Sequence, residues 1–287
     1  MTVINDKQYL FEKMKVPKAV MYLVIPTIIS QLITIIYNWA DIFFVGQLND
    51  TFQMAAITIC YPAFMMTTAL SNLLGIGGAS AISRALGNNN YDKIKKISTM
   101  SLLLSIVLSI LYSFIVLILN KPLLYLLGAD NDTINFAQEY LFWVVIIGSL
   151  PSVVNYSLSH LIRATGKSQS ASIGIAMGGI INIILDPIFI FVFKLDVSGA
   201  AIATFISNLL ACIYFIITRK NSILNFSLKN LKFKDSVIFD IISSGLSSFF
   251  LSLMALFSNA SINKLMSGYS ASAISGVNIA KKVDLCI

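Results

Sequence analysis

Residues 19–46 read AVMYLVIPTIISQLITIIYNWADIFFVG, and this run decides the class of fold. About 20 apolar residues are enough for a helix to cross the hydrocarbon core of a bilayer. Because lipid offers the backbone no hydrogen-bond partner, only helices and closed barrels cross it, and barrel strands would alternate in hydrophobicity. This run does not alternate. We therefore predict a membrane-spanning helix here.

Further runs of the same kind follow, and the composition agrees with them. Apolar residues make up 57% of the 287 residues, charged residues make up 11%, and the mean hydropathy is +0.83. A soluble domain carries about 25% charged residues because its surface faces water. The sequence thus predicts an all-α polytopic membrane protein. The predicted spans are residues 19–46, 52–80, 97–119, 139–162, 169–193, 199–218 and 237–266, and an eighth begins near residue 270.

Basic residues gather in alternate loops between these spans. Fifteen Lys and Arg residues precede the first span or follow the second, fourth and sixth, whereas three lie on the opposite side. Cytoplasmic loops carry such an excess, so we predict a multi-pass cell-membrane protein with a cytoplasmic N-terminus. The same distribution accounts for the net charge of +7 without a nucleic-acid partner.

The seventh span resembles the first, which indicates an internal repeat. When residues 25–48 are shifted onto 242–268, Asn38 aligns with Asn259. Internal repeats are common in transporter folds. The predicted organisation is a six-helix N-terminal lobe at residues 1–218, a cytoplasmic inter-lobe loop at 219–236, and an incomplete C-terminal lobe at 237–287 with helix seven and part of helix eight.

A few polar residues enter the predicted spans. Those of the first span recur at steps of three and four, which places them on one helical face. A carboxylate in hydrocarbon costs about 3 kcal/mol on insertion scales, so this face is expected to point at protein or water. The stripe consists of Thr27, Gln31, Thr34, Asn38 and Asp41.

Partners for Asp41 lie on the fifth and sixth spans. Asn182 and Asp186 are four residues apart on one span, and Thr204 lies on a small, mildly polar face of the next. At about 1.5 Å per residue, the two carboxyl groups and Thr204 all lie roughly 10 Å below the outer surface. We predict that they form one site for a proton or a sodium ion, since either would neutralise a pair of carboxylates.

Pro26 removes a backbone hydrogen bond from the first span and is predicted to act as its hinge. Ion binding at Asp41 would let the span bend and shrink a central cavity, so that a bound substrate leaves outward. An ion can drive this change only if it binds the two states with different affinities.

With these residues in view, the chain resembles the MATE (multidrug and toxin extrusion) family, in particular its bacterial MepA-type branch. The strings that carry the resemblance run through essentially the whole chain: IYNWADIFFVGQL, SRALGNNNYDKIKK, LLGADNDTINFAQEYL, LIRATGKSQSA and NIILDPIFIFVFKLDVSGAAIAT. The resemblance implies twelve helices in two lobes that open alternately to each side. It implies export of cationic amphipathic drugs in exchange for protons or sodium ions, with no further cofactor. We expect a monomer.

The resemblance also implies roles for single residues. It assigns the coupling ion, including a sodium ion, to Asp41, Asn182, Asp186 and Thr204. The substrate cavity is expected to include Tyr37, Asn38, Gln31 and Asn155.

Two features depart from the family pattern. The seventh span reads GLSSF where the family usually has a proline, and the chain ends at VDLCI inside the predicted eighth span. We therefore expect a C-terminally truncated chain, and an inactive fragment stays an alternative.

Two other classes of protein compete with an antiporter. A lipid-linked oligosaccharide flippase has a similar two-lobed plan, but its cavity is expected to be basic, whereas the intramembrane charges here are acidic. An aspartyl intramembrane protease would place its aspartates in YD and GxGD contexts, whereas Asp41 follows Ala40 and Asp186 lies in IILDP. The sequence therefore favours a transporter over an enzyme.

Overall fold

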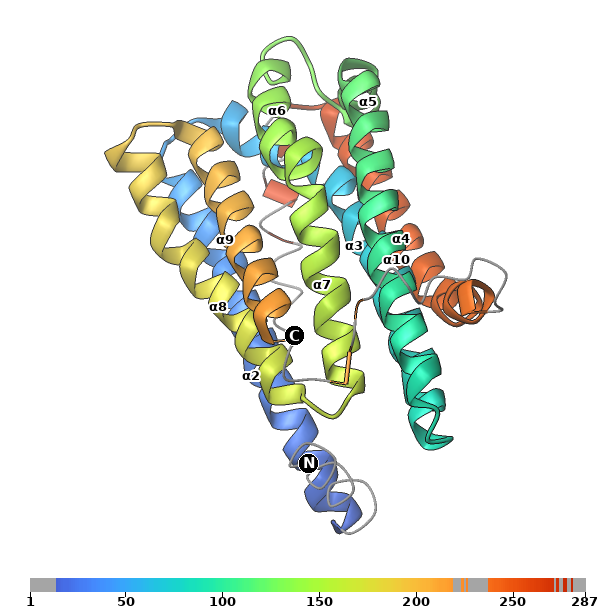
Figure 1. Cartoon of the computed structure of the whole chain (residues 1–287). Helices are drawn as coiled ribbons and strands as arrows, with labels where there is room; N and C mark the ends of the chain where they lie inside the picture. Colours follow the sequence, from blue (N-terminus) through green and yellow to red (C-terminus); the bar gives the residue numbers. More distant parts are fainter. Residues whose placement is uncertain are drawn as a thin grey trace.

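The computed structural model describes residues 14–218 and 237–270, together with residues 223, 224, 226, 272, 273, 276, 277 and 280. Within this part the chain is helical and contains no strand, which confirms the predicted all-α class (Figure 1). The elements are α2 Val16–Gly46, α3 Thr51–Gly87, α4 Tyr91–Ile118, α5 Asn120–Leu127, α6 Ile134–Leu141, η2 Phe142–Ile147, α7 Ser149–Ala164, α8 Ser168–Pro187, η3 Ile188–Val192, α9 Asp196–Thr218 and α10 Val237–Ser267.

Six of the described helices are long and apolar enough to cross a membrane, and a bent pair brings the number of spans to seven. They coincide with the seven predicted spans to within a few residues at most ends, although α3 and α4 extend further on the side where they join. The predicted eighth span and the predicted loop at 219–236 lie largely outside the described residues.

The fourth span differs from the continuous helix predicted at 139–162. It consists of Ile134–Ile147 and Ser149–Ala164, which meet at an angle of 48°. Pro151 has no N–H to donate and its ring displaces the carbonyl one turn earlier, and the residues before the bend widen into the π-helical segment η2. A proline also ends α8, where Pro187 precedes the π-helical segment η3. Inserted π turns of this kind relieve the crowded carbonyl.

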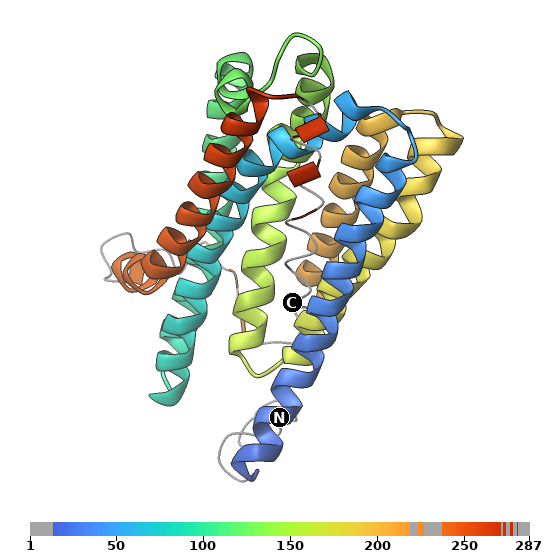
Figure 2. The same cartoon turned by 180° about the vertical axis from the view of Figure 1, so that it is seen from behind.

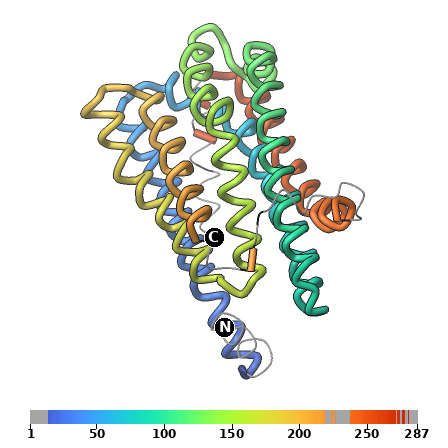
Figure 3. Tube along the Cα trace, in the orientation of Figure 1, coloured from blue at the N-terminus to red at the C-terminus, as the bar shows by residue number. Residues whose placement is uncertain are grey.

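The helices form two groups that flank α7. Helices α2, α8 and α9 lie together on one side, while α3, α4 and α10 lie on the other, as opposite views of the chain show (Figures 1 and 2). The α7 helix contacts α3, α4, α8 and α9 and therefore joins the groups. The tube in Figure 3 shows that α2 and α8 run side by side over much of their length.

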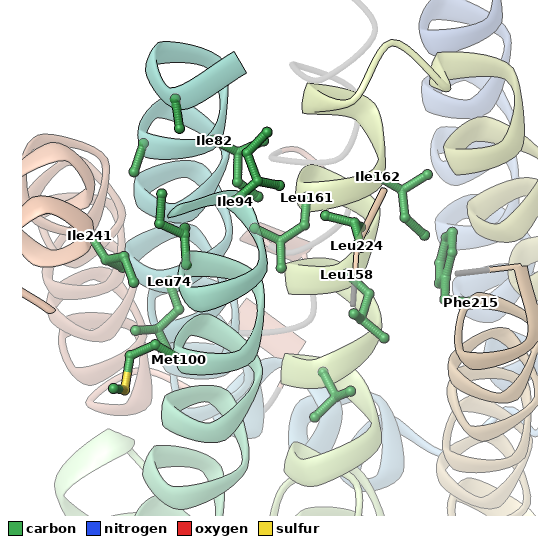
Figure 4. Packing of buried hydrophobic residues seen from close by; sticks show 14 of the residues in the cluster. Leu74, Ile82, Ile94, Met100, Leu158, Leu161, Ile162, Phe215, Leu224 and Ile241 are labelled. Carbon is green, nitrogen blue, oxygen red and sulfur yellow. The ribbon is translucent and has the colours of Figure 1, made fainter. Parts of the chain in front are cut away.

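Apolar packing around α7 supplies the core between the groups. Leu158 and Leu161 of α7 are fully buried and pack in one cluster with Leu74 of α3 and Phe215 of α9 (Figure 4). The outward faces are equally apolar but exposed, as at Ile28 on α2. Soluble proteins rarely expose so much contiguous apolar area to water, whereas apolar surface is stable in contact with lipid. The arrangement is that of a multi-pass membrane protein.

Helix α10 crosses α3 at very short range. A Cβ on Gly245 would overlap the carbonyl oxygen of Leu73, and one on Gly77 would overlap that of Ile241. Small residues permit such close backbone contact between membrane helices. The structure packs α10 against α3. That α10 belongs to a second lobe is still a prediction.

Hydrogen bonds between polar side chains also connect α3 and α10 along their length. The Asn72 amide donates to Ser252 Oγ at 3.0 Å, Arg84 donates to Ser244 Oγ at 2.9 Å, and the buried Asn263 amide donates to the Thr58 carbonyl at 2.7 Å. Lys93 of α4 forms an ion pair with Asp240 of α10 at 2.8 Å. We call this set of contacts the α3–α10 seam.

Candidate functional site

Three helices bring the predicted ion-site residues together. The carboxyl groups of Asp41 on α2 and Asp186 on α8 lie within hydrogen-bonding reach of each other. The Asn182 amide lies beside them and donates to Asp186 Oδ1 at 3.3 Å and to Thr204 Oγ1 of α9 at 3.4 Å. Four residues that are up to 163 positions apart in sequence therefore form one cluster, as the depth argument predicted.

Local structure explains how the cluster forms. Asn182 and Asp186 are one helical turn apart on α8, so both point toward the same neighbours. On the same helix, a Cβ on Gly179 would lie 3.1 Å from Tyr37 Cδ1, so the absent side chain lets α2 approach α8 closely. Asp186 is fully buried and Asn182 is 2% exposed. A buried carboxyl pair is stable only if a proton or a metal cation neutralises part of its charge.

A cavity opens beside Asp41. Four of its eleven lining residues are aromatic, and we call it the aromatic cavity. The faces of aromatic rings attract organic cations, and Asp41 and Asn38 add a carboxyl and an amide group to the same wall. The lining consists of Tyr37, Asn38, Asp41, Ile42, Ile57, Tyr61, Phe64, Tyr140, Val144, Ala200 and Thr204.

A second, smaller cavity shares Tyr37 and Thr204 with the first. It contains three asparagines, and we call it the asparagine cavity. The Asn155 amide of α7 donates to Asn208 Oδ1 of α9 at 3.1 Å, and Asn208 donates to the Thr204 carbonyl at 2.9 Å. The lining consists of Thr34, Tyr37, Asn155, Tyr156, Ile175, Gly178, Gly179, Asn182, Thr204, Ser207 and Asn208.

The predicted substrate-cavity residues fall in different places. Tyr37 and Asn38 line the aromatic cavity, and Asn155 lines the asparagine cavity. Gln31 is exposed and lines neither of them. Pro26 lies inside α2, which continues through it as one helix from Val16 to Gly46.

Several lining residues were not predicted, and three of them carry polar or aromatic groups that matter for the site: Tyr61, Tyr140 and Asn208. Tyr61 and Tyr140 belong to the aromatic wall, and their helices carry no polar stripe that would have marked them. Asn208 lies one turn after Thr204 on α9, so the same spacing rule that paired Asn182 with Asp186 could have found it.

The site offers few charged ligands. Among the described residues no three His, Cys, Asp or Glu side chains converge as a metal site would require. The cluster offers two carboxyl groups together with amide and hydroxyl oxygens. Oxygen ligands of this kind suit hard cations, and the low charge suits a monovalent ion.

Comparison with known proteins agrees with this arrangement. The MatE family model matches residues 26–188. The Multidrug export protein MepA of Staphylococcus saprophyticus is 33% identical over 279 residues, which are 96% of this chain and 61% of that protein. MepA of Staphylococcus aureus is also 33% identical, over 96% of this chain and 61% of that protein.

Solved structures agree as well. A multidrug resistance MATE family transporter of the MOP superfamily in an inward-facing conformation superimposes with a TM-score of 0.80 at 26% identity, over 89% of this chain and 59% of that one. A MOP superfamily transporter from Pyrococcus furiosus, described as having a binding pocket of reverse polarity, gives a TM-score of 0.85 at 26% identity, over 97% of this chain and 62% of that one. The chain thus spans about three fifths of the length of these relatives. On the family match and the shared fold, this chain belongs to the MATE family.

Proposed function

We propose that this chain forms the ion-binding part of a secondary antiporter that exports cationic amphipathic drugs in exchange for protons or sodium ions. The observation that carries the proposal is the carboxyl pair of Asp41 and Asp186, of which Asp41 lines the aromatic cavity. We further propose that the protein resides in the cell membrane as a monomer with a cytoplasmic N-terminus.

The aromatic cavity suits an organic cation. Tyr37, Tyr61, Phe64 and Tyr140 supply ring faces, and a cation over such a face gains about 0.5–2 kcal/mol, with the larger values where water is excluded. Asp41 adds a negative charge beside the rings. An inorganic ion bound to the carboxyl pair and a drug cation in this cavity would both interact with the charge of Asp41, so binding of one opposes binding of the other. This opposition is the coupling that exchange needs.

The ion would act through α2, which contributes Asp41 and contains Pro26. Neutralising the pair removes the charge that favours a drug cation in the aromatic cavity. If the ion binds more tightly to the state in which α2 is bent, the population shifts toward that state. Because proline has no backbone N–H, the helix already lacks one hydrogen bond at Pro26, and bending there breaks no further one.

A flippase for anionic lipid-linked sugars is the competing function. Its cavity is expected to be basic in order to hold a pyrophosphate. None of the described residues that line the two cavities is Lys or Arg. The polarity of the site therefore favours cationic substrates.

The test is drug efflux from cells that express the gene encoding this chain. Asp41→Asn should reduce ethidium efflux at least tenfold, because the amide keeps the shape of the side chain but removes its charge. Asp132→Asn, in an exposed loop, is the matched control and should leave efflux unchanged. Wild-type efflux by an Asp41→Asn variant that is expressed at the normal level would reject the proposed role.

A further inference from the structure

Hydroxyl groups connect α2 to the start of α8 on both sides of Pro26. Ser168 Oγ, on the first residue of α8, donates to the carbonyl oxygen of Leu23 at 2.7 Å and lies 3.1 Å from Thr27 Oγ1. Thr27 Oγ1 lies 3.1 Å from the same carbonyl oxygen. Leu23 precedes the proline in α2, and Thr27 follows it directly. We call these three groups the Ser168 clasp.

The number of hydrogens on the two hydroxyl groups orders the clasp. Each hydroxyl group has one hydrogen to donate. A chain in which Thr27 donates to Ser168 and Ser168 donates to the Leu23 carbonyl uses both hydrogens and includes the shortest of the three contacts. Ser168 is fully buried, so water does not compete for these bonds. The hydroxyl of Ser168 is therefore the link between the two helices at this level.

The clasp crosses the turn at which α2 is proposed to bend. Pro26 lacks an N–H and its ring displaces the carbonyl one turn earlier, so this turn is a weak point of the helix. Helix α2 nevertheless continues through it from Val16 to Gly46. In membrane helices, hydroxyl side chains and neighbouring helices satisfy backbone groups near a proline. A bend at Pro26 turns Leu23 relative to Thr27, so one hydroxyl group on α8 cannot keep its contacts with both.

The clasp is separate from the carboxyl pair. Thr27 and Asp41 lie 14 residues apart on α2, which corresponds to about 21 Å along the helix. On its side away from α8, α2 is exposed at Ile28 and Ile29. No described helix covers these residues, so the clasp is a contact near Pro26 that a bend in that direction has to break.

We propose that Ser168 is a positioning residue that holds α2 straight at Pro26 and releases it when α2 bends. The inference rests on the proposed antiport function, in which the coupling ion favours the bent state, and adds the residue that sets how easily α2 bends. Without this hydroxyl group the straight state loses bonds that the bent state lacks. The equilibrium should shift toward the bent state by about three- to tenfold, the contribution of one or two such hydrogen bonds.

Pulsed electron spin resonance on the full chain in lipid nanodiscs measures the bend. Spin labels attached through Phe43→Cys and Ile118→Cys, both at exposed positions, report the distance between the ends of α2 and α4 in a background without native cysteines. Protons or sodium are titrated from high pH in choline chloride. In Ser168→Ala, the ion concentration that produces half of the distance change should fall about three- to tenfold.

Ser30→Ala is the matched control for the loss of a buried hydroxyl group. Ser30 is also buried on α2, but its hydroxyl group donates to the Thr27 carbonyl within the same helix. Its titration curve should match that of the wild type. Adding Thr27→Val to Ser168→Ala should cause little further shift, since both substitutions break the same connection.

The outcomes separate the clasp from the proposed function. If the wild type bends with the ion and Ser168→Ala gives the same curve, or one shifted to higher ion concentration, this inference fails and the proposed function stands. If Ser168→Ala is more bent than the wild type but neither responds to protons or sodium, the clasp stands and the proposed function fails. An unchanged distance in every sample refutes both. Should Ser168→Ala not fold, Thr27→Val alone replaces it, because valine keeps the shape of threonine without its hydroxyl group.

Discussion

The α3–α10 seam and the two cavities differ in how most of their buried polar groups are satisfied, although the seam also contains one buried acceptor without a donor among the described residues, Asn263 Oδ1. In the seam, backbones touch at Gly77 and Gly245, and polar side chains such as Asn72 and Arg84 donate to hydroxyl groups across the contact. In the cavities, amide oxygens lie buried without a donor among the described residues, and two carboxyl groups face each other.

The difference distinguishes polar groups that stabilise the packing of two helices from polar groups that are available to bind a ligand. A hydrogen bond that is satisfied within the protein adds stability and leaves nothing for a ligand. A buried oxygen without a partner costs stability until a ligand arrives, which is typical of functional sites. Substitutions in the seam should therefore change the free energy of unfolding, whereas substitutions in the cavities should change ion binding.

The largest effect on stability is expected at Gly245. Its added side chain in Gly245→Leu would overlap the Leu73 backbone, which cannot move away as a flexible side chain can. Overpacking of this kind costs about 3 kcal/mol. Thermal unfolding in detergent measures the loss through the reaction of a fluorescent maleimide with the buried thiols of Cys60 and Cys212, in a Cys286→Ser background.

The matched control for this variant is Gly87→Ala at the end of α3, where a Cβ meets no atom within 4 Å. It should leave the unfolding temperature unchanged or raise it slightly, since alanine favours helix by about 1 kcal/mol over glycine. Equal destabilisation by the two variants would show that the seam is not tightly packed.

A smaller effect of opposite sign is expected at Asp186. Asp186→Asn keeps an oxygen for the Asn182 amide but removes one charge from the carboxyl pair. We expect the variant to be more stable than the sodium-free wild type by about 1 kcal/mol, because the amide removes the repulsion between two nearby buried carboxyl groups. Sodium should raise the unfolding temperature of the wild type alone. An equal rise in both proteins would place the sodium elsewhere.

The smallest effect is expected at the ion pair between Lys93 and Asp240. Both side chains are about one third exposed, and pairs of this kind contribute about 0.5 kcal/mol or less. Lys93→Met should therefore lower the unfolding temperature only slightly. Added salt should lower the unfolding temperature of the wild type toward that of the variant. A loss as large as that of Gly245→Leu would mean that the ion pair, and not the glycine contact, holds the seam.

The sequence predicted the spans and the grouping of Asp41, Asp186 and Thr204 because both follow from periodicity and depth. Apolar length fixed seven spans, and residue counts along helices placed Asp41, Asp186 and Thr204 at one level. Pro151 indicated a bend in the fourth span, since proline removes a helical hydrogen bond. The angle of 48° and the π-helical segment before it could not be predicted, because they depend on how neighbouring helices accept the freed carbonyl.

The cavities were only partly predictable for a different reason. Tyr61 and Tyr140 reach the wall of the aromatic cavity because α3 and α6 pack against each other. Neither helix carries a polar pattern that would have indicated this. The orientation of the Asn155 amide depends on Asn208, a residue 53 positions away. Contacts between helices, unlike faces of one helix, leave no local signal in sequence.

The central claim is that Asp41 and Asp186 share one exchangeable cation, and carbodiimide labelling tests it most directly. Dicyclohexylcarbodiimide modifies buried protonated carboxyl groups, and mass spectrometry identifies the modified residue. The account predicts an adduct on Asp41 or Asp186 whose yield falls when sodium is added at fixed pH, while Asp132 is unaffected. Adducts on neither residue of the pair, or a yield that responds neither to sodium nor to pH, would contradict it.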